Sequence, residues 1–208
     1  MPDLNQLRTS SLKGRARSMK MKFSEEDEFG LRRLLKGFQL FRRGRRRKIE
    51  NIMHHSTFDR KTFVFDYTYV TGKNNSNKYH RQSVMFLNSK NLGLPQFSMK
   101  PENLWHQLTD WLRITSDIDF ESHPDFSEKY FLTSENEQLI RYLFDKDVLD
   151  FFTVQKNWYV EGVNYYLIIY SLNERLHPKI IESFVNMGNK LYELLRVHPE
   201  WMKLDHPL

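Results

Sequence analysis

The strongest structural signal in the sequence is the run Lys61-Thr62-Phe63-Val64-Phe65-Asp66-Tyr67-Thr68-Tyr69-Val70. β-Branched and aromatic residues fill most of it, which is typical of a β-strand. A loop rich in Gly, Asn, Ser and Lys follows at 72–78, and another apolar run follows at 80–87. Two such runs joined by a short polar loop predict an antiparallel hairpin.

Downstream of this hairpin, the sequence predicts two more strand regions. A short strand contains Phe97 and Met99, and residues 157–171 are interpreted as a second hairpin that turns near Glu161-Gly162. The second arm of that hairpin, which contains the run from Tyr165 to Tyr170, is apolar enough to be buried on both faces.

Helices are predicted at three places in the same part of the chain. One begins at Pro101, one follows a capping box formed by Ser134 and Glu137, and a long one begins at Pro178. No repeated strand-helix-strand alternation is present, so a parallel sheet is not expected. The expected fold class is α+β, with an antiparallel meander sheet packed with helices and a long C-terminal helix.

The N-terminal part of the chain is polar and basic. Residues 1–22 show no sustained hydrophobic period and are predicted to be a flexible basic tail. A helix is predicted to begin at Ser24, because acids fill its first turn and apolar residues follow at Phe29, Leu34, Leu35, Phe38 and Phe41. We therefore expect a single α+β domain at 23–198 and a short C-terminal tail at 199–208.

Composition places the chain among ordinary globular proteins. Of its 208 residues, 39% are hydrophobic and 14% are aromatic, which suffices for a sizeable core. Cysteine is absent, so disulfides, thiolate metal sites and cysteine nucleophiles are excluded. No apolar run is long enough to span a bilayer, and no signal peptide is present, so we expect a cytoplasmic location.

Charge is distributed unevenly along the chain. Residues 1–48 hold 15 Lys and Arg against 5 Asp and Glu, whereas the remainder is mildly acidic. The densest run of cations consists of Arg42, Arg43, Arg45, Arg46, Arg47 and Lys48. Such a run predicts an anion-binding strip that contacts a phospholipid surface, a membrane protein or, as a less favoured partner, nucleic acid. The alternative is a solvated strand edge whose cations prevent aggregation.

A series of short motifs resembles a large family of uncharacterised bacterial membrane-associated proteins. The motifs run from about Phe23 to Leu195 and include 38–45, 47–51, 64–67, 94–102, 117–120 and 125–130. This resemblance implies a domain on the cytoplasmic side of the membrane, usually preceded by transmembrane helices, with no established activity. Because this chain carries a basic polar segment in place of those helices, we expect peripheral contact at the inner face of the membrane.

Two other patterns offer competing hypotheses. Phe63, Phe65, Tyr67 and Tyr69 share one strand face, which could stack bases or could form part of the core. In an extended chain Asp117, Asp119, Glu121 and His123 also project on one side, and are the candidate ligands for a divalent cation. A single strand spaces such side chains too widely to surround an ion, so these four residues alone predict no metal site.

No catalytic or cofactor motif is present in the sequence. It lacks an HExxH arrangement, a GxSxG elbow, a P-loop and a dinucleotide-binding glycine pattern. No cofactor is expected, and the oligomeric state is left open. The favoured hypothesis is a noncatalytic docking module, followed by a nucleic-acid-binding protein and then by a metal-dependent hydrolase centred on 117–123.

Overall fold

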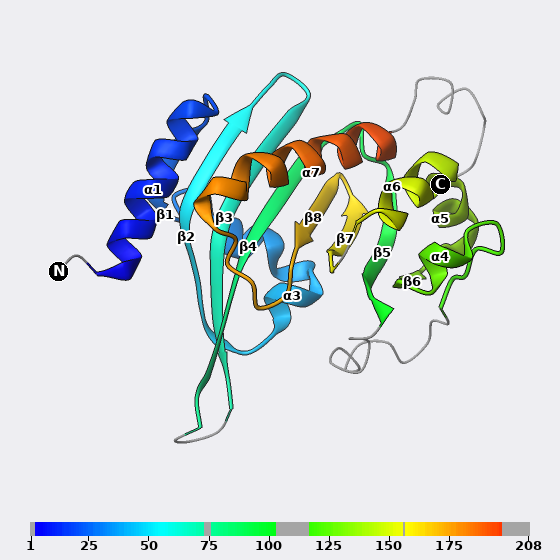
Figure 1. Cartoon of the computed structure of the whole chain (residues 1–208), viewed down its shortest axis with the longest axis horizontal. Coiled ribbons are helices and arrows are strands. Elements are labelled where there is room, and N and C mark those ends of the chain that lie inside the picture. Colours follow the sequence, from blue (N-terminus) through cyan, green and yellow to red (C-terminus); the bar gives the residue numbers. More distant parts are fainter. Residues whose placement is uncertain (1–2, 73–75, 103–116, 156, 197–208) are drawn as a thin grey trace.

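A computed structural model describes residues 3–72, 76–102, 117–155 and 157–196. Its centre is an eight-stranded antiparallel sheet in the order β1-β2-β3-β4-β8-β7-β5-β6 (Figure 1). The strands are β1 (Lys22–Glu26), β2 (Arg45–Ser56), β3 (Arg60–Thr71), β4 (Lys78–Ser89), β5 (Leu94–Pro101), β6 (Tyr130–Ser134), β7 (Tyr159–Asn164) and β8 (Tyr166–Tyr170). The predicted α+β class with an antiparallel sheet is confirmed.

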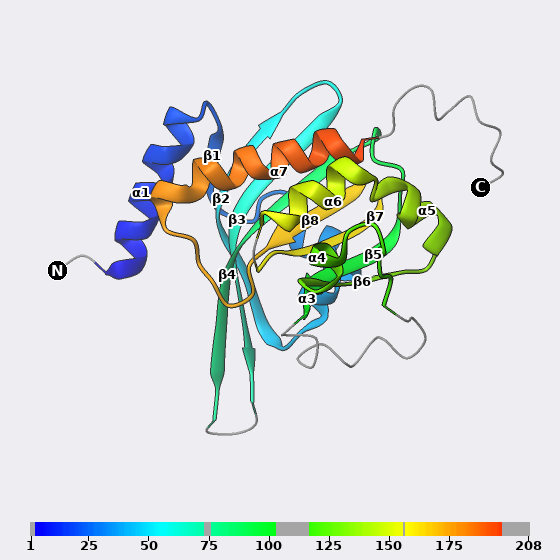
Figure 2. The same cartoon turned by 45° about the vertical axis from the view of Figure 1, so that its right-hand side comes forward.

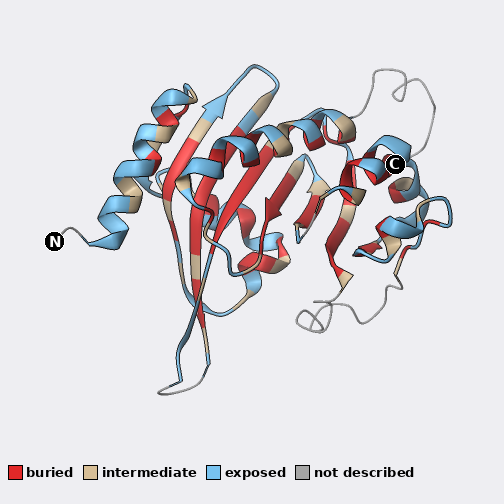
Figure 3. Cartoon of the chain, in the orientation of Figure 1, coloured by how far each residue is buried: buried red, intermediate tan, exposed pale blue. Residues whose placement is uncertain are grey.

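The hairpin predicted from residues 61–87 is confirmed as β3 and β4. These strands pair in continuous register from Arg60 opposite Ser89 to Thr71 opposite Lys78. Their outer end projects well beyond the rest of the sheet (Figure 1). Most of the sheet is buried where helices cover it, and the hairpin becomes exposed toward its tip (Figure 3).

One face of the sheet is covered by α1 (Leu4–Ser18), α5 (Glu137–Leu143), α6 (Lys146–Thr153) and α7 (Ile181–Leu195) (Figure 2). The short helix α4 (Pro124–Ser127) packs against α6 and β6, and the 3-10 turn η3 (Pro178–Ile180) precedes α7. Apolar residues of these helices pack against alternate strand residues such as Val64, Met85 and Ile169. We call this side of the sheet the α1 face. The predicted long C-terminal helix is confirmed as α7.

The opposite face is covered by a chain segment with three short helical turns. These are α2 (Leu31–Leu34), η1 (Leu35–Gly37) and α3 (Gln39–Arg42). Leu31, Leu35, Leu40 and Phe41 pack there against the aromatic side of β3. We call this side the α3 face.

The prediction of a flexible tail at 1–22 is wrong, because α1 forms there and β1 begins at Lys22. The side chain of Asp3 caps the helix by accepting from the amide of Asn5. Only Leu12 and Ala16 are fully buried along it, so it lacks a broad apolar stripe. A long-range ion pair between Arg8 and Asp66 of β3 holds the helix instead.

The helix predicted from Ser24 is also wrong. Residues 22–26 form an edge strand, in which Phe23 pairs with Met53 of β2. One of the acids predicted to stabilise a helix start does so at α2, further along the chain. The Asp27 carboxylate accepts hydrogen bonds from the amides of Leu31 and Arg32 at 2.9 and 3.0 Å. Gly30 adopts the left-handed conformation immediately before α2, at φ +68°.

Smaller differences concern the ends of elements. The cap of α5 is Asn136 rather than Ser134, since its side chain accepts from the amide of Leu139. Glu161 and Gly162 lie within β7, and the second hairpin turns after Asn164. The predicted helix does not start at Pro101, because this residue ends β5 opposite Tyr130. The rest of that predicted helix, at 103–116, and the predicted tail at 199–208 lie outside the described residues.

Candidate functional site

The basic segment, which we define as residues 42–48, runs from the end of α3 into the start of β2, where Arg45 pairs with Val70 near the turn of the β3-β4 hairpin. Its position depends on the buried carboxylate of Glu161, which accepts from the amides of Gln39 and Leu40 at 2.6 and 3.3 Å and from the Tyr170 hydroxyl at 2.9 Å. These bonds fix the start of α3 on the sheet. Burial raises the pKa of Glu161, and its hydrogen bonds and the nearby Arg43 guanidinium oppose that rise.

Two arginines of the segment donate to uncharged acceptors. The Arg47 guanidinium bonds the backbone carbonyls of Arg42, Arg43 and Gly44, the last two at 2.9 Å. Arg45 reaches the hairpin end, where it donates to the Gly72 carbonyl and, at 2.7 Å, to Asn77 Oδ1. Because carbonyl and amide oxygens carry no net charge, these contacts orient the cations without neutralising them.

The remaining cations have different surroundings. Lys48 forms an ion pair with Glu50, two positions along β2. Arg46 is exposed, in the left-handed conformation at φ +52°. Arg43 is half-buried and approaches the Tyr69 hydroxyl at 3.5 Å. Among the six predicted anion-binding residues, Lys48 therefore has a carboxylate partner, whereas Arg45 and Arg47 donate to neutral oxygens.

Cations of the neighbouring turns enlarge this basic region. Arg32, Arg33 and Lys36 are exposed on α2 and η1, since Leu31 and Leu35 occupy the inward positions. The positive charges of Arg47 and Arg32 both lower the pKa of the buried Tyr67 phenol, against the larger raising effect of its burial. Leu34 stands among these cations with 40% of its surface exposed.

The aromatic side of β3 belongs to the core. Phe63, Phe65, Tyr67 and Tyr69 are all buried, and Phe41 packs 4.4 Å from the Tyr67 ring. Base stacking requires an exposed ring face, so these residues offer no stacking platform.

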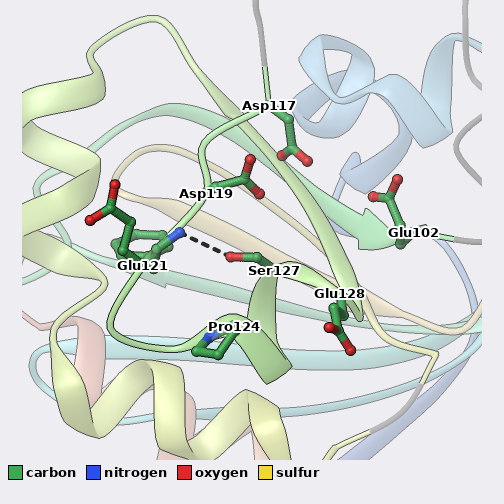
Figure 4. Close-up of a pocket in the computed structure, with 8 residues that line it drawn as sticks. Glu102, Asp117, Asp119, Glu121, Pro124, Ser127 and Glu128 are labelled. Carbon is green, nitrogen blue, oxygen red and sulfur yellow. Dashed lines mark hydrogen bonds between the residues drawn. The ribbon is translucent and has the colours of Figure 1, made fainter.

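The acidic residues predicted as candidate metal ligands line an open hollow of about 500 Å³ (Figure 4). Residues 117–120 have no regular secondary structure, contrary to the extended strand considered from the sequence. Asp117, Asp119 and Glu121 border the hollow together with Glu102 and Glu128, whereas His123 lies 3.4 Å from Asp150. Within the four described ranges, no three acidic or histidine side chains are grouped closely enough to hold a metal ion.

Asp117 has the most perturbed carboxyl group of this hollow. Burial raises its pKa to about 6, with smaller contributions from the charges of Asp119 and Glu102. The amide of Leu132 donates to Asp117 Oδ1 at 2.8 Å and opposes the rise. The carboxyl group is thus held in a structural hydrogen bond beside β6.

Comparison with known proteins shows a similarity in fold to a solved structure. No protein-family model matches the chain, and no curated protein is similar to it in sequence. Among solved structures, it is similar to the mycobacterial trehalose monomycolate transport factor A, TtfA, with a TM-score of 0.61 over 92% of this chain and 97% of that chain. The two share 14% sequence identity, so the match shows a common fold.

Three buried charges that organise the molecule were missed in the sequence. Asp66, Lys100 and Glu161 each occupy a strand position and are less than 5% exposed. The Lys100 ammonium has no hydrogen-bond partner among the described residues and lies 4.7 Å from the centroid of the Phe131 ring. A single charge inside an apolar strand run, as in Phe65-Asp66-Tyr67, is the signal that could have revealed them.

Proposed function

We propose that this protein is a noncatalytic module that docks on an anionic membrane surface through the basic region of its α3 face. The docking surface comprises Arg32, Arg33 and Lys36 together with residues 42–47 of the basic segment, since Lys48 projects on the other face of β2 and pairs with Glu50. The observation that carries the proposal is the hydrogen bonding of Arg45 and Arg47 to neutral acceptors, which leaves their positive charge uncompensated. A phosphate-rich surface would supply the missing negative charge.

Local structure supports a lipid surface over other anionic partners. The partly exposed Leu34 lies between Arg33 and Lys36 in sequence, and an apolar side chain among cations suits the boundary between headgroups and acyl chains. In contrast, the aromatic residues of β3 that were the candidates for base stacking are buried. Within the described part of the chain, no helix is long and apolar enough to cross a membrane.

The structural neighbour is compatible with a role other than catalysis. TtfA is described as a transport factor, and its fold covers nearly all of this chain. In addition, the acidic hollow does not bring metal-ligating side chains together within the described residues. Both observations favour an interaction module over a metal-dependent hydrolase.

The proposal is tested by sedimentation with phosphatidylcholine vesicles that contain or lack phosphatidylglycerol. The test variant combines Arg32→Gln, Arg33→Gln, Lys36→Gln and Arg46→Gln, because these side chains are exposed and form no hydrogen bond or ion pair within the described residues. The control variant removes the same charge at Arg17, Lys61, Lys90 and Lys179, which are also exposed.

Each cation near an anionic surface contributes about 1 kcal/mol, so loss of the four cations, about 4 kcal/mol in total, should weaken binding of the test variant to anionic vesicles by about three orders of magnitude. The control variant should lose much less, because its cations lie away from the docking surface. Equal binding of the unmodified protein to neutral vesicles would overturn the proposal, as would equal losses in the two variants. Tighter binding to duplex DNA than to anionic vesicles at matched low salt would favour the nucleic-acid hypothesis instead.

A further inference from the structure

A second group of cations lies on the α1 face, on the other side of the sheet from the docking surface. Strand register places Lys48, Thr68 and Arg81 side by side on β2, β3 and β4. The next row toward the core contains Glu50, Asp66 and Ser83. Neighbouring strands are about 4.8 Å apart, so a single small anion could contact more than one strand of this row.

Two of the cations in this region already have acidic partners. Arg8 of α1 binds both carboxylate oxygens of Asp66 at 2.7 Å, and Lys48 pairs with Glu50. The Asp66 carboxylate also accepts a hydrogen bond from the side chain of Asn51, which donates to Oδ2 at 3.0 Å. The acids of the two rows are therefore engaged by Arg8 and Lys48.

Arg175 adds a cation from the loop that follows β8. The carbonyl of Glu174 accepts from the amide of Ser83 at 3.0 Å, and the amide of Leu176 donates to the Ser83 hydroxyl at 3.1 Å. These two bonds place Arg175 against β4, next to the row that contains Arg81. Within the described residues, its guanidinium forms no hydrogen bond and no ion pair, although the residue is partly buried.

The fold disfavours the charge on Arg175. Burial lowers the pKa of its guanidinium, and the neighbouring charges of Arg8 and Arg81 lower it further, against opposing contributions from Asp66 and Glu50. A partly desolvated arginine in the field of other arginines is a destabilising arrangement unless negative charge compensates it. Such local conflicts are typical of binding sites.

Arg81 is held in place without being neutralised. Its guanidinium lies 5.3 Å from the centroid of the Tyr79 ring. The aromatic face orients the cation but, unlike a carboxylate, carries no negative charge that would neutralise it. The half-buried hydroxyl of Thr68 lies on the neighbouring strand, directly opposite Arg81.

We infer that Arg81, Arg175 and Thr68 form a binding site for the phosphate group of a phosphomonoester. Two guanidinium groups match the nearly dianionic charge of such a group at neutral pH, and their planar donor pairs suit its terminal oxygens. The Thr68 hydroxyl supplies a further donor. The phosphate could belong to a soluble metabolite or to a lipid headgroup such as phosphatidic acid, because both present the same chemical group.

The site is tested by titrating the whole protein with inorganic phosphate at constant ionic strength while recording amide NMR spectra and melting temperature. Variants Arg81→Gln and Arg175→Gln are compared with Arg17→Gln, an exposed arginine of α1 outside the site. We expect both site variants to bind phosphate at least about tenfold more weakly, whereas the control binds as the unmodified protein does. The control is needed because phosphate also stabilises proteins without binding them.

A second measurement separates a binding role from a structural one. In phosphate-free buffer, Arg175→Gln should melt at the same temperature as the unmodified protein or higher, because it removes a disfavoured charge. A clear fall in melting temperature would show that Arg175 serves the fold and would overturn the inference.

Vesicles containing phosphatidic acid or phosphatidylglycerol form the lipid arm. Binding of inorganic phosphate that depends on Arg81 and Arg175 supports the site with a soluble source, and a dependence seen only with phosphatidic acid vesicles supports it with a headgroup source. The absence of any such dependence in both arms overturns it. Because the docking-surface variants leave these residues unchanged, failure of one proposal leaves the other testable.

Discussion

The ion pair between Arg8 and Asp66 is expected to hold helix α1 on the sheet, and Arg8→Met tests this directly. The Arg8 side chain is 10% exposed and that of Asp66 is 2% exposed, so solvent screens the pair weakly. Removing one partner of a buried pair costs about 3–5 kcal/mol, because the other charge stays buried without compensation. Asp66 retains hydrogen bonds from Asn51 and Ser83, which favours the lower end of that range, about 3 kcal/mol.

Urea denaturation followed by tryptophan fluorescence measures this loss, and thermal melting provides a second estimate. For a chain of this size, 1 kcal/mol corresponds to about 2–4 °C, so the melting temperature should fall by roughly 6–12 °C. The double variant Arg8→Met/Asp66→Asn should recover part of the loss, because it removes both charges together.

Hydrogen exchange identifies where the stability is lost. If the pair fastens α1, amides of residues 4–18 should exchange faster in Arg8→Met than those of β3 and β4. A loss below about 1 kcal/mol, with unchanged exchange in α1, would refute the reasoning, since the pair would then contribute no more than an exposed ion pair.

Two further predictions concern a carboxyl group and a pair of helical glycines. Because the folded pKa of Asp117 is raised to about 6, its charge destabilises the fold as pH rises from about 4 through 6, and Asp117→Asn should raise the melting temperature at pH 7.5 but not at pH 4. After allowance for partial exposure, the gain should be about 1 kcal/mol, and loss of stability at pH 7.5 would contradict it. Gly188→Ala should destabilise by about 1 kcal/mol in urea denaturation, since a Cβ there would lie 2.3 Å from Met85 Sδ. Gly14→Ala is the matched control in α1, where no atom lies within 4 Å, and it should stabilise by about 0.5–1 kcal/mol; equal effects at the two glycines would refute the packing argument.

Local patterns in the sequence predicted the elements whose stability comes from their own residues. The hairpin of β3 and β4 has alternating aromatic residues and a polar loop, and α7 has apolar residues at helical spacing, so both could be predicted. The helix α1 could not, because its attachment depends on a carboxylate 58 positions away. The segment after Ser24 was assigned to a helix because its acids suit a helix start, yet pairing with β2 outweighs that preference.

The sequence predicted which cations belong to the candidate site but not how they are arranged or paired. The sequence identified the cations of segment 42–48, but which of them meet carboxylates depends on backbone geometry. A bulge in β2 between Arg45 and Lys48 turns Arg46 outward, while Arg47 folds back onto the preceding carbonyls. Arg175 had no distinguishing pattern, because its environment is built from β3, β4 and α1 together.

The strand order has a consequence for synthesis of the chain. β4 lies between β3 and β8, and its residues Val84–Asn88 pair with Tyr166–Tyr170, which the ribosome adds much later. Until β8 emerges, the growing polypeptide displays an unpaired and strongly apolar strand edge, which is a template for aggregation. Fragments that stop before Tyr166 should therefore precipitate or require chaperones, and expression trials are best designed around the full sheet.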